Sequence, residues 1–237
     1  MVGADRCCYF CVSCRGYYWG ALNKGTVSNM TQGKRLLNNE DSLAIFGTGQ
    51  MADLASYYFK QENINISFYL HDNYDLKESK FLDKPVLHLQ EFISEKNILS
   101  NKIFVAVSYH EQNCIREKYF QMFLQNGYDL ISYVSKDAFL ASDVIIGKNC
   151  LVLEGAVVQK TTQIRDNTFI WTGAQIGHRS TLGENVFIGS GAVLMGCNAI
   201  GRNSHVSANA TIYDHVEIEP HQTISPGKIL GPTLIQN

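Results

Sequence analysis

Residues 170–194 read IWTGAQIGHRSTLGENVFIGSGAVL, and an aliphatic residue stands at every sixth position of this stretch. Stepping by six from Ile146 to Ile224 gives fourteen positions, and all fourteen are Ile, Leu or Val. A mostly small residue stands two places before each aliphatic residue, and glycine recurs directly after it. A period of six fits neither the 3.6-residue turn of a helix nor the alternation of an ordinary hairpin sheet.

The six-residue period predicts a parallel β-helix, in which each hexapeptide forms one flat face and a turn, and three hexapeptides form one triangular coil. The aliphatic side chain points into the narrow interior, where a small residue fits beside it. Nine of the 19 glycines fall within residues 146–224, and we expect those that follow the aliphatic residues to relieve positive φ at the corners. This segment of 79 residues makes about 4.4 coils, each paired only with its neighbours.

The composition of the whole chain limits what it can bind. Its 237 residues carry 20 basic and 22 acidic side chains, a formal charge of −2, and 45% of them are hydrophobic. This length suits one large or two small globular domains. The near-neutral charge argues against a nucleic-acid or anionic-membrane binder, and no apolar run approaches the roughly 20 residues that span a bilayer. We therefore expect no nucleic-acid and no membrane partner.

Residues 1–41 are polar and show no periodicity. Four of the seven cysteines lie here, in the run CCYFCVSC (residues 7–14). Four thiolates at short spacing could bind zinc, but a structural zinc site usually joins two separated pairs and no second pair follows. The segment also lacks the apolar core of a signal peptide. We interpret the segment as a disordered leader whose cysteines are reduced. Reduced cysteines are typical of a reducing compartment, so we expect a cytoplasmic protein.

Residues 42–137 alternate between strand-like and helix-like segments. The expected strands are residues 43–46, 66–70, 103–107 and 131–134, and the expected helices are residues 51–61 and 111–125. Alternating β and α segments over about 90 residues predict a small parallel, Rossmann-like α/β domain. The sequence thus divides into a leader (1–41), an α/β domain (42–137) and a β-helix domain (138–237).

The turn after the first expected strand carries Gly47-x-Gly49. Two glycines after a strand are a phosphate-loop pattern, in which the backbone approaches an anion at a helix N-terminus. The pattern is one glycine short of the full dinucleotide fingerprint, with Ala52 at the third place, so an ordinary tight turn is the alternative. His71 and Asp72 end the next strand, where base or ribose contacts are expected. For Asp72, a plain strand-end turn is the alternative.

Together these features resemble one family, the hexapeptide-repeat acyltransferases that modify sialic acids and nucleotide-linked amino sugars, among them bacillosamine, perosamine and viosamine N-acetyltransferases. The resemblance covers about residues 42–224. It rests on the stretches IFGTG (45–49), FYLHDN (68–73), KPVL (84–87), TGAQIGH (172–178) and LGENVFIGSGA (182–192). It implies a left-handed β-helix, a homotrimer, acetyl-CoA bound as co-substrate in a cleft between adjacent β-helices, and a nucleotide sugar held by the α/β domain.

The resemblance also implies residue roles. His178, two residues after Ile176, takes the position of the catalytic base, which accepts the proton of an amine as it attacks the thioester. Gly196, eighteen residues later, and Ala208 would lie along the cofactor, and a backbone amide on an adjacent coil could donate to the oxyanion. The substrate-binding residues would be Gly47, Gly49, Gln50, Met51, His71 and Asp72.

Three departures from the family pattern concern these sites. The family usually has an acidic residue directly after the catalytic histidine, where this chain has Arg179. We assign the orienting role to Glu184, with Asp166 or a backbone carbonyl as alternatives. Phe187, which we expect at the cofactor, stands where the family has a second histidine. A glycine and a histidine of the family's phosphate loop are also replaced.

Three further histidines, His205, His215 and His221, suggest comparison with the metal-binding β-helix enzymes of the gamma carbonic anhydrase type. Such a site needs histidines that converge between subunits, two of them on one coil and about five residues apart. His215 and His221 are six residues apart, on successive faces with the same orientation, so they do not converge. We expect no metal.

The sequence as a whole predicts an acetyl-CoA-dependent N-acetyltransferase that acts on the amino group of a nucleotide-linked amino sugar, in polysaccharide biosynthesis. Two alternatives stay open. One is O-acetylation of a sugar such as a sialic acid. The other is a non-catalytic, structural β-helix trimer, which would leave His178 and the α/β domain without a role.

Overall fold

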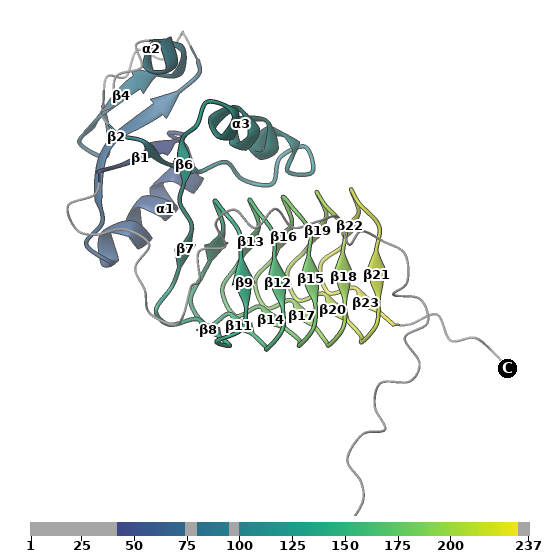
Figure 1. The fold of residues 1–237 in the computed structure, drawn as a ribbon. Coiled ribbons are helices and arrows are strands. Elements are labelled where there is room, and N and C mark those ends of the chain that lie inside the picture. Colours follow the sequence, from purple (N-terminus) through teal and green to yellow (C-terminus); the bar gives the residue numbers. More distant parts are fainter. Residues whose placement is uncertain (1–41, 74–79, 95–99, 232–237) are drawn as a thin grey trace, which may run out of the picture.

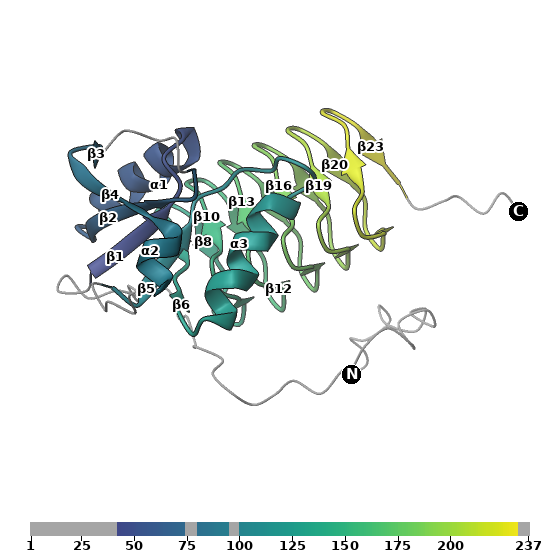
Figure 2. The same ribbon diagram turned by 90° about the horizontal axis from the view of Figure 1, so that it is seen from above.

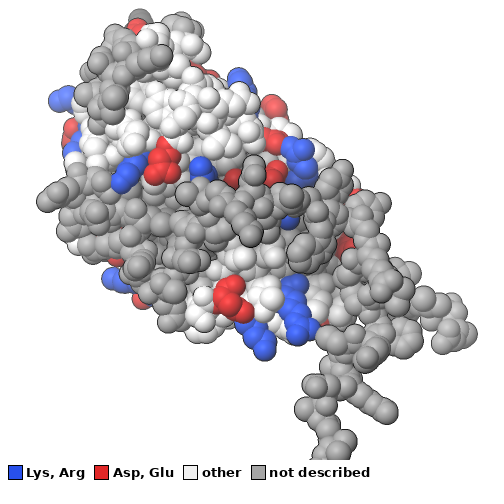
Figure 3. Space-filling model, in the orientation of Figure 1, with Lys and Arg blue, Asp and Glu red and all other residues white. Residues whose placement is uncertain are grey.

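The computed structural model describes residues 42–73, 80–94 and 100–231. It has two parts, a small α/β domain and a long left-handed β-helix whose coils stack away from it (Figure 1). The fold class expected from the sequence is confirmed. Basic and acidic side chains intermix on the described part of the face in Figure 3. Within the described ranges, no helix is both long and apolar enough to cross a membrane.

The α/β domain is built on one sheet with the strand order β3-β4-β2-β1-β5-β6. The strands are β1 (Ser42–Phe46), β2 (Asn65–His71), β3 (Lys80–Phe81), β4 (Lys84–His88), β5 (Lys102–Val105) and β6 (Asp129–Leu130). The helices are α1 (Gln50–Gln61), α2 (Leu89–Ser94) and α3 (Cys114–Gln125). Side chains alternate along β1, so that Leu43 and Ile45 pack with α1, and Ala44 and Phe46 with α2 and α3. Burial on both sides explains the continuous apolar run of this strand.

The β-helix has three parallel sheets, which we call its first, second and third faces. The first face is β7 (Tyr133–Val134), β10 (Leu151–Val152), β13 (Phe169–Ile170), β16 (Phe187–Ile188), β19 (His205–Val206) and β22 (Thr223–Ile224). The second face is β8 (Phe139–Leu140), β11 (Val157–Val158), β14 (Gln175–Ile176), β17 (Val193–Leu194), β20 (Thr211–Ile212) and β23 (Ile229–Leu230). The third face is β9 (Ile145–Ile146), β12 (Gln163–Ile164), β15 (Thr181–Leu182), β18 (Ala199–Ile200) and β21 (Glu217–Ile218).

The pairing register of these strands confirms the predicted coil. Ile170 pairs with Ile188, and Ile176 with Leu194, so that each residue lies beside the residue eighteen positions later. The aliphatic residues of the six-residue series fill the interior, and those from Ile146 to Ile212 are at most 8% exposed. The period read from the sequence is therefore the period of the core.

The expected reason for the glycines after the interior aliphatic residues is wrong. Gly177 and Gly201 do not have positive φ. A β-carbon at either position would instead come within 2.4 Å of the backbone of the next coil, so these glycines let the coils stack closely. Positive φ occurs instead three residues after the interior aliphatic residue, as at Asn167, Arg179 and Asn185. Asparagine is favoured there because it tolerates the left-handed region better than most residues.

Two segment boundaries also differ from expectation. Only Tyr133–Val134 of the expected strand at 131–134 forms a strand, β7, which pairs with β10 of the β-helix, whereas the preceding β6 pairs with β5 of the α/β sheet. The expected helix at 111–125 begins only at Cys114, since Glu111 and Gln112 have positive φ, as does Asn113. Asn113 is buried, and its Nδ2 donates to the backbone oxygen of Ser204 at 3.4 Å. Contact with the β-helix thus shapes this turn.

The α/β domain is joined to the β-helix by a ladder of four buried asparagines, one per coil. The asparagine ladder consists of Asn149, Asn167, Asn185 and Asn203, and each donates a side-chain hydrogen bond to the next, at 2.7, 2.6 and 3.1 Å. Both ends reach the α/β domain. The N–H of Val105 donates to Asn149 at 2.8 Å, and Asn203 donates to Glu117 at 2.7 Å. The ladder therefore fixes the domain against four successive coils.

A buried arginine reinforces this junction. Arg116 of α3 is fully buried, and its Nη2 donates to the backbone oxygens of Asn167 and Asn185, each at 3.2 Å. The guanidinium carbon lies 4.2 Å from the ring centroid of Phe169. Burial lowers the pKa of Arg116, while the carbonyl oxygens and the ring face stabilise its charged form. Helix α3 lies along the coils as a result (Figure 2).

Candidate active site

Residues eighteen positions apart stack above one another at the corners of the β-helix. At the corner between the second and third faces, two residues after strands β11, β14, β17 and β20, this gives one residue per coil. We call this set the corner column, and it consists of Lys160, His178, Gly196 and Asp214. His178 and Gly196 are therefore neighbours on adjacent coils.

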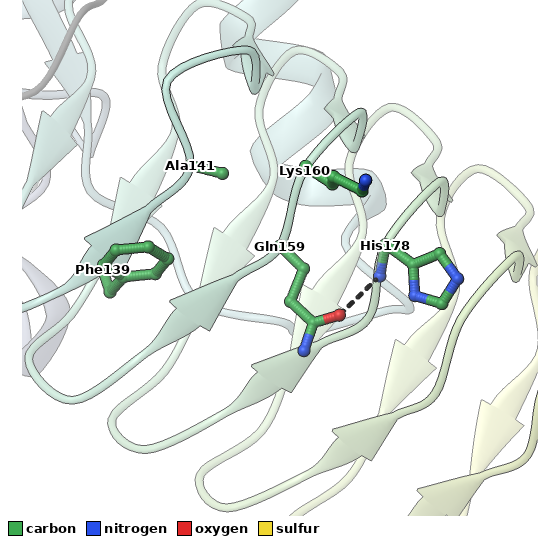
Figure 4. Close-up of a pocket in the computed structure, with 5 residues that line it drawn as sticks. All are labelled: Phe139, Ala141, Gln159, Lys160 and His178. Atoms are coloured by element: carbon green, nitrogen blue, oxygen red, sulfur yellow. Dashed lines mark hydrogen bonds between the residues drawn. The ribbon is translucent and has the colours of Figure 1, made fainter.

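The imidazole of His178 lies on the backbone of Gly196. A β-carbon at Gly196 would come within 2.5 Å of the ring atom Cε1, 2.9 Å of Nδ1 and 3.0 Å of Nε2. The backbone N–H of His178 donates to Oε1 of Gln159 at 3.1 Å (Figure 4). The side chain of His178 is exposed, so a ligand can reach the ring from the solvent side.

The amide of Gly196 is already engaged. Its N–H donates to Oδ1 of Asp214 at 2.6 Å. An amide on an adjacent coil was the expected oxyanion donor, but here a carboxylate accepts its hydrogen and places negative charge beside it. In this arrangement the Gly196 N–H is not open to a second acceptor.

A hollow of about 440 Å³ lies beside His178. We call it the His178 hollow, and it is lined by Phe139, Ala141, Gln159, Lys160 and His178 (Figure 4). Phe139 and Ala141 supply apolar surface, and the polar lining consists of an imidazole, an amide and an ammonium group. The volume lies within the range of roughly 300–1,000 Å³ that is usual for small-molecule sites. A group of sugar size can thus meet the imidazole here.

The carboxylates expected to orient His178 lie elsewhere. Glu184 follows β15, at the corner between the third and first faces. Asp166 lies at the same corner one coil earlier, where its Oδ1 accepts the N–H of Lys148 at 2.8 Å. Within one chain, the structure brings neither carboxylate to the corner of His178. The carboxylate of the corner column is Asp214.

The other two expected cofactor residues also lie away from His178 within one chain. Phe187 is on the first face and 4% exposed. Its ring packs against Tyr109, with the ring centroids 4.9 Å apart, and against Trp171 and His205. Ala208 lies in the turn between the first and second faces. Phe187 therefore contributes to the core that joins the two parts of the molecule.

Two polar side chains in this aromatic cluster have unusual surroundings. Burial and the nearby charge of Arg116 lower the pKa of His205, which favours the neutral form of its ring. The indole Nε1 of Trp171 is buried and has no hydrogen-bond partner among the described residues.

The expected nucleotide-sugar residues lie at the carboxyl edge of the α/β sheet. Gly47 follows β1 with a φ of 121°, and a β-carbon there would come within 2.9 Å of the oxygen of Ala106, so backbone packing requires glycine. Gly49 caps α1 without a side-chain hydrogen bond, and Gln50 is exposed. Met51 lies in the first turn of α1, and its side chain is buried in the core. It can therefore contact a ligand only through its backbone.

His71 and Asp72 lie at the end of β2, next to this loop. The hydroxyl of Tyr119 on α3 donates to Oδ2 of Asp72, and burial together with this bond raises the pKa of Tyr119. Nδ1 of His71 accepts the N–H of Asn73 at 2.8 Å, which leaves Nε2 of the ring as the donor to a ligand. The structure thus brings the loop after β1 and the end of β2 together.

Among residues 42–73, 80–94 and 100–231, no cluster of three or more His, Cys, Asp or Glu side chains is arranged to hold a metal ion. His205 lies on the first face, whereas His215 and His221 lie at two different corners. The cysteine run at 7–14 and the rest of the leader lie outside the described residues.

Several residues around His178 are not part of any sequence motif. They are Phe139, Ala141, Gln159 and Asp214. The coil period identifies them. Asp214 lies two coils after His178. Phe139 lies two coils before Gln175 of β14, and Ala141 lies two coils before Gly177. Extending the eighteen-residue spacing to both sides of the candidate base would have identified this wall of the site.

The repeat segment matches a known family model. Residues 161–196 match the model described as bacterial transferase hexapeptide (six repeats), and this stretch includes both His178 and Gly196. No curated protein gives a significant match to the chain.

Several solved structures share this fold over most of the chain. PerB from Caulobacter crescentus, in complex with CoA and GDP-perosamine, is 20% identical over 81% of this chain and 89% of its own, with a TM-score of 0.71. The acetyltransferase domain of PglB from Neisseria gonorrhoeae is 23% identical over 81% and 97%, with a TM-score of 0.60, and WeeI from Acinetobacter baumannii AYE is 18% identical over 81% and 89%, with a TM-score of 0.56. The likeness expected from the sequence is confirmed at the level of the fold.

Proposed function

We propose that this chain is an acetyl-CoA-dependent acyltransferase that acetylates the amino group of a nucleotide-linked amino sugar, with His178 as the general base. The observation that carries the proposal is the packing of the His178 imidazole on Gly196, at the rim of the His178 hollow. The fold supports it, since PerB with this architecture holds CoA and GDP-perosamine, and the PglB domain has been solved with acetyl coenzyme A.

The chemistry requires a group that accepts a proton next to a bound thioester. A neutral amine attacks the carbonyl carbon, and an imidazole beside it takes the amine proton and returns it to the departing sulfur. General base catalysis of this kind typically contributes about 10²–10⁴-fold to the rate. The backbone of Gly196 limits where the ring of His178 can lie, which helps to hold it in position for this transfer.

The carboxyl edge of the α/β sheet is our candidate site for the nucleotide sugar. The first turn of α1 begins at Gly49 without a side-chain cap, so the backbone amides of Gln50 and Met51 can receive a diphosphate at the positive end of the helix. His71, with Nε2 as donor, and Asp72 stand at the end of the neighbouring strand, where a ribose or base would lie.

The site is incomplete within one chain, and a homotrimer would complete it. Ala208 and Glu184 lie away from the corner column. Ala208 can therefore meet the same cofactor as His178, and Glu184 can orient His178, only if they come from a neighbouring copy. Apolar side chains are exposed along the second face, including Phe139 at 52% and Ile229 at 64%. Burial of such a stripe against a second β-helix is favourable.

The test is the release of thiol from acetyl-CoA in the presence of UDP-, dTDP- and GDP-linked 4-amino sugars. We expect turnover with at least one of them and an N-acetylated product by mass spectrometry. Acetylation of a sialic acid hydroxyl, with no turnover of any amino sugar, would replace the proposal by O-acetylation. No turnover with either class would favour a structural trimer.

A further inference from the structure

The proposed acyl transfer needs a donor for the oxygen of the thioester, which becomes negative as the amine attacks. Such donors work when they stand about 2.7–3.1 Å from that oxygen and are already oriented. One group of this chain must fill this role if the proposed function, on which the inference rests, holds.

The backbone amides around His178 are already used. The N–H of Gly196 donates to Asp214 at 2.6 Å, and the N–H of His178 donates to Gln159 at 3.1 Å. Three further amides donate to carbonyl oxygens of neighbouring coils, at 2.7–3.0 Å: those of Gly177, Arg179 and Cys197. An oxyanion at Gly196 would also meet the negative carboxylate of Asp214. Within one chain, the donor that remains available at this corner is therefore a side chain.

We propose that the ammonium group of Lys160 stabilises the oxyanion. Lys160 lies in the corner column one coil before His178, and adjacent strands are about 4.8 Å apart. Its side chain lines the His178 hollow together with the imidazole, and both project from the same corner (Figure 4). Within the described ranges, no hydrogen bond or ion pair engages its Nζ atom. The remaining lining includes no carboxylate.

Asp143, whose carboxylate interacts with the charge of Lys160, has a hydrogen-bond partner of its own. Asp143 lies on the preceding coil, and its Oδ2 accepts the hydroxyl hydrogen of Thr161 at 3.0 Å. The pKa of Asp143 is lowered first by the backbone hydrogen bond of Thr161, and the charge of Lys160 is a smaller contribution. No ion pair within the described ranges joins Asp143 to Lys160, and the Lys160 side chain lines the His178 hollow.

The step balances without a change in the charge of Lys160. The amine lone pair forms the C–N bond while the carbonyl π pair moves to oxygen, beside the ammonium, and His178 takes the amine proton. The oxygen pair then reforms the carbonyl, the C–S bond breaks, and the sulfur takes the proton back from the imidazolium to leave as thiol. A nearby cation also lowers the pKa of an incoming ammonium substrate, so more of the amine is neutral.

The test compares Lys160→Met and Lys160→Arg with a matched control, Lys228→Met, an exposed lysine before β23. We expect Lys160→Met to lower kcat by about 10²–10³-fold with KM changed by less than about threefold, and Lys160→Arg to retain part of the rate. Lys228→Met should behave like wild type, and all three should keep the wild-type circular dichroism spectrum.

Two outcomes would overturn the inference, and they are distinguishable. If Lys160→Met keeps kcat within about threefold of wild type while His178→Asn is inactive, the oxyanion role is wrong and the proposed function stands. If the wild-type chain releases no thiol with any amino sugar, the proposed function fails and the role of Lys160 fails with it.

Discussion

The imidazole of His178 rests on the backbone of Gly196, close enough that a β-carbon at Gly196 would come within 2.5 Å of Cε1. The two residues are eighteen positions apart, and the coil repeat brings them together. Any side chain on the second residue would take the space of the ring. The position of the candidate base is therefore determined by the absence of a side chain on the next coil.

Substitution of this glycine should reposition the base without unfolding the chain. We expect Gly196→Ala to lower kcat by about 10–10²-fold, because its methyl group displaces the ring of His178 and small misplacements of catalytic groups are costly. Gly231→Ala is the matched control, since a β-carbon there meets nothing within 4 Å. Steady-state thiol release measures both, and full activity of Gly196→Ala would show that the ring position is unimportant.

The asparagine ladder should contribute strongly to stability. Asn185→Ala removes a fully internal member that both donates and accepts a hydrogen bond, and it takes away the partner of Nδ2 of Asn167 and of Oδ1 of Asn203, both buried. We expect the free energy of unfolding to fall by about 1–3 kcal/mol, measured by denaturant titration. Asn209→Ala is the control, because Asn209 has the same positive φ but is exposed. Equal losses in the two variants would contradict the role of the ladder.

Stability should also depend on pH through His205. Burial and Arg116 lower its pKa below the ordinary value of 6.5, so the unfolded chain binds more protons below that pH than the folded chain does. The stabilisation is complete above about pH 6.5 and decreases as the pH falls through that value. Urea titrations between about pH 5 and 7.5 should show this slope in wild type and in His110→Gln, and a smaller slope in His205→Gln. An unchanged slope in His205→Gln would contradict the prediction.

The second face should be the contact between copies. We expect Val193→Glu, at an outward position of β17, to dissociate a trimer because it places a charge in an apolar contact, and to lower activity with it. Ala199→Glu is the matched control, since it lies on the third face of the same coil and is exposed. Sedimentation velocity distinguishes the two. A trimer that survives Val193→Glu but not Ala199→Glu would move the contact to the third face.

The sequence was sufficient to predict the β-helix because its signal is periodic. Once Ile170 and Ile176 are recognised as successive interior positions, the pairing of Ile176 with Leu194 follows, and so does the neighbourhood of His178 and Gly196. Local rules were enough here, because each coil contacts only the coils beside it.

Other features depended on contacts that no local pattern encodes. Met51 was expected at the start of a helix, beside a diphosphate, but tertiary packing buries its side chain. Helix α3 begins late because Asn113 is held by the β-helix. Only Tyr133–Val134 of the expected strand at 131–134 forms a strand, because the chain passes from the α/β sheet to the β-helix there. The bond from the Gly196 amide to Asp214 spans one coil, and the side-chain rotamer that makes it cannot be read from spacing.

The most direct test of the central claim is the kcat for thiol release by His178→Asn, compared with wild type on the best amino-sugar substrate. Asparagine keeps a polar side chain of similar reach but cannot accept the amine proton at neutral pH. The account predicts that kcat falls by about 10²–10⁴-fold, with KM within about threefold of wild type. Equal kcat values for wild type and His178→Asn would contradict the assignment of His178 as the general base.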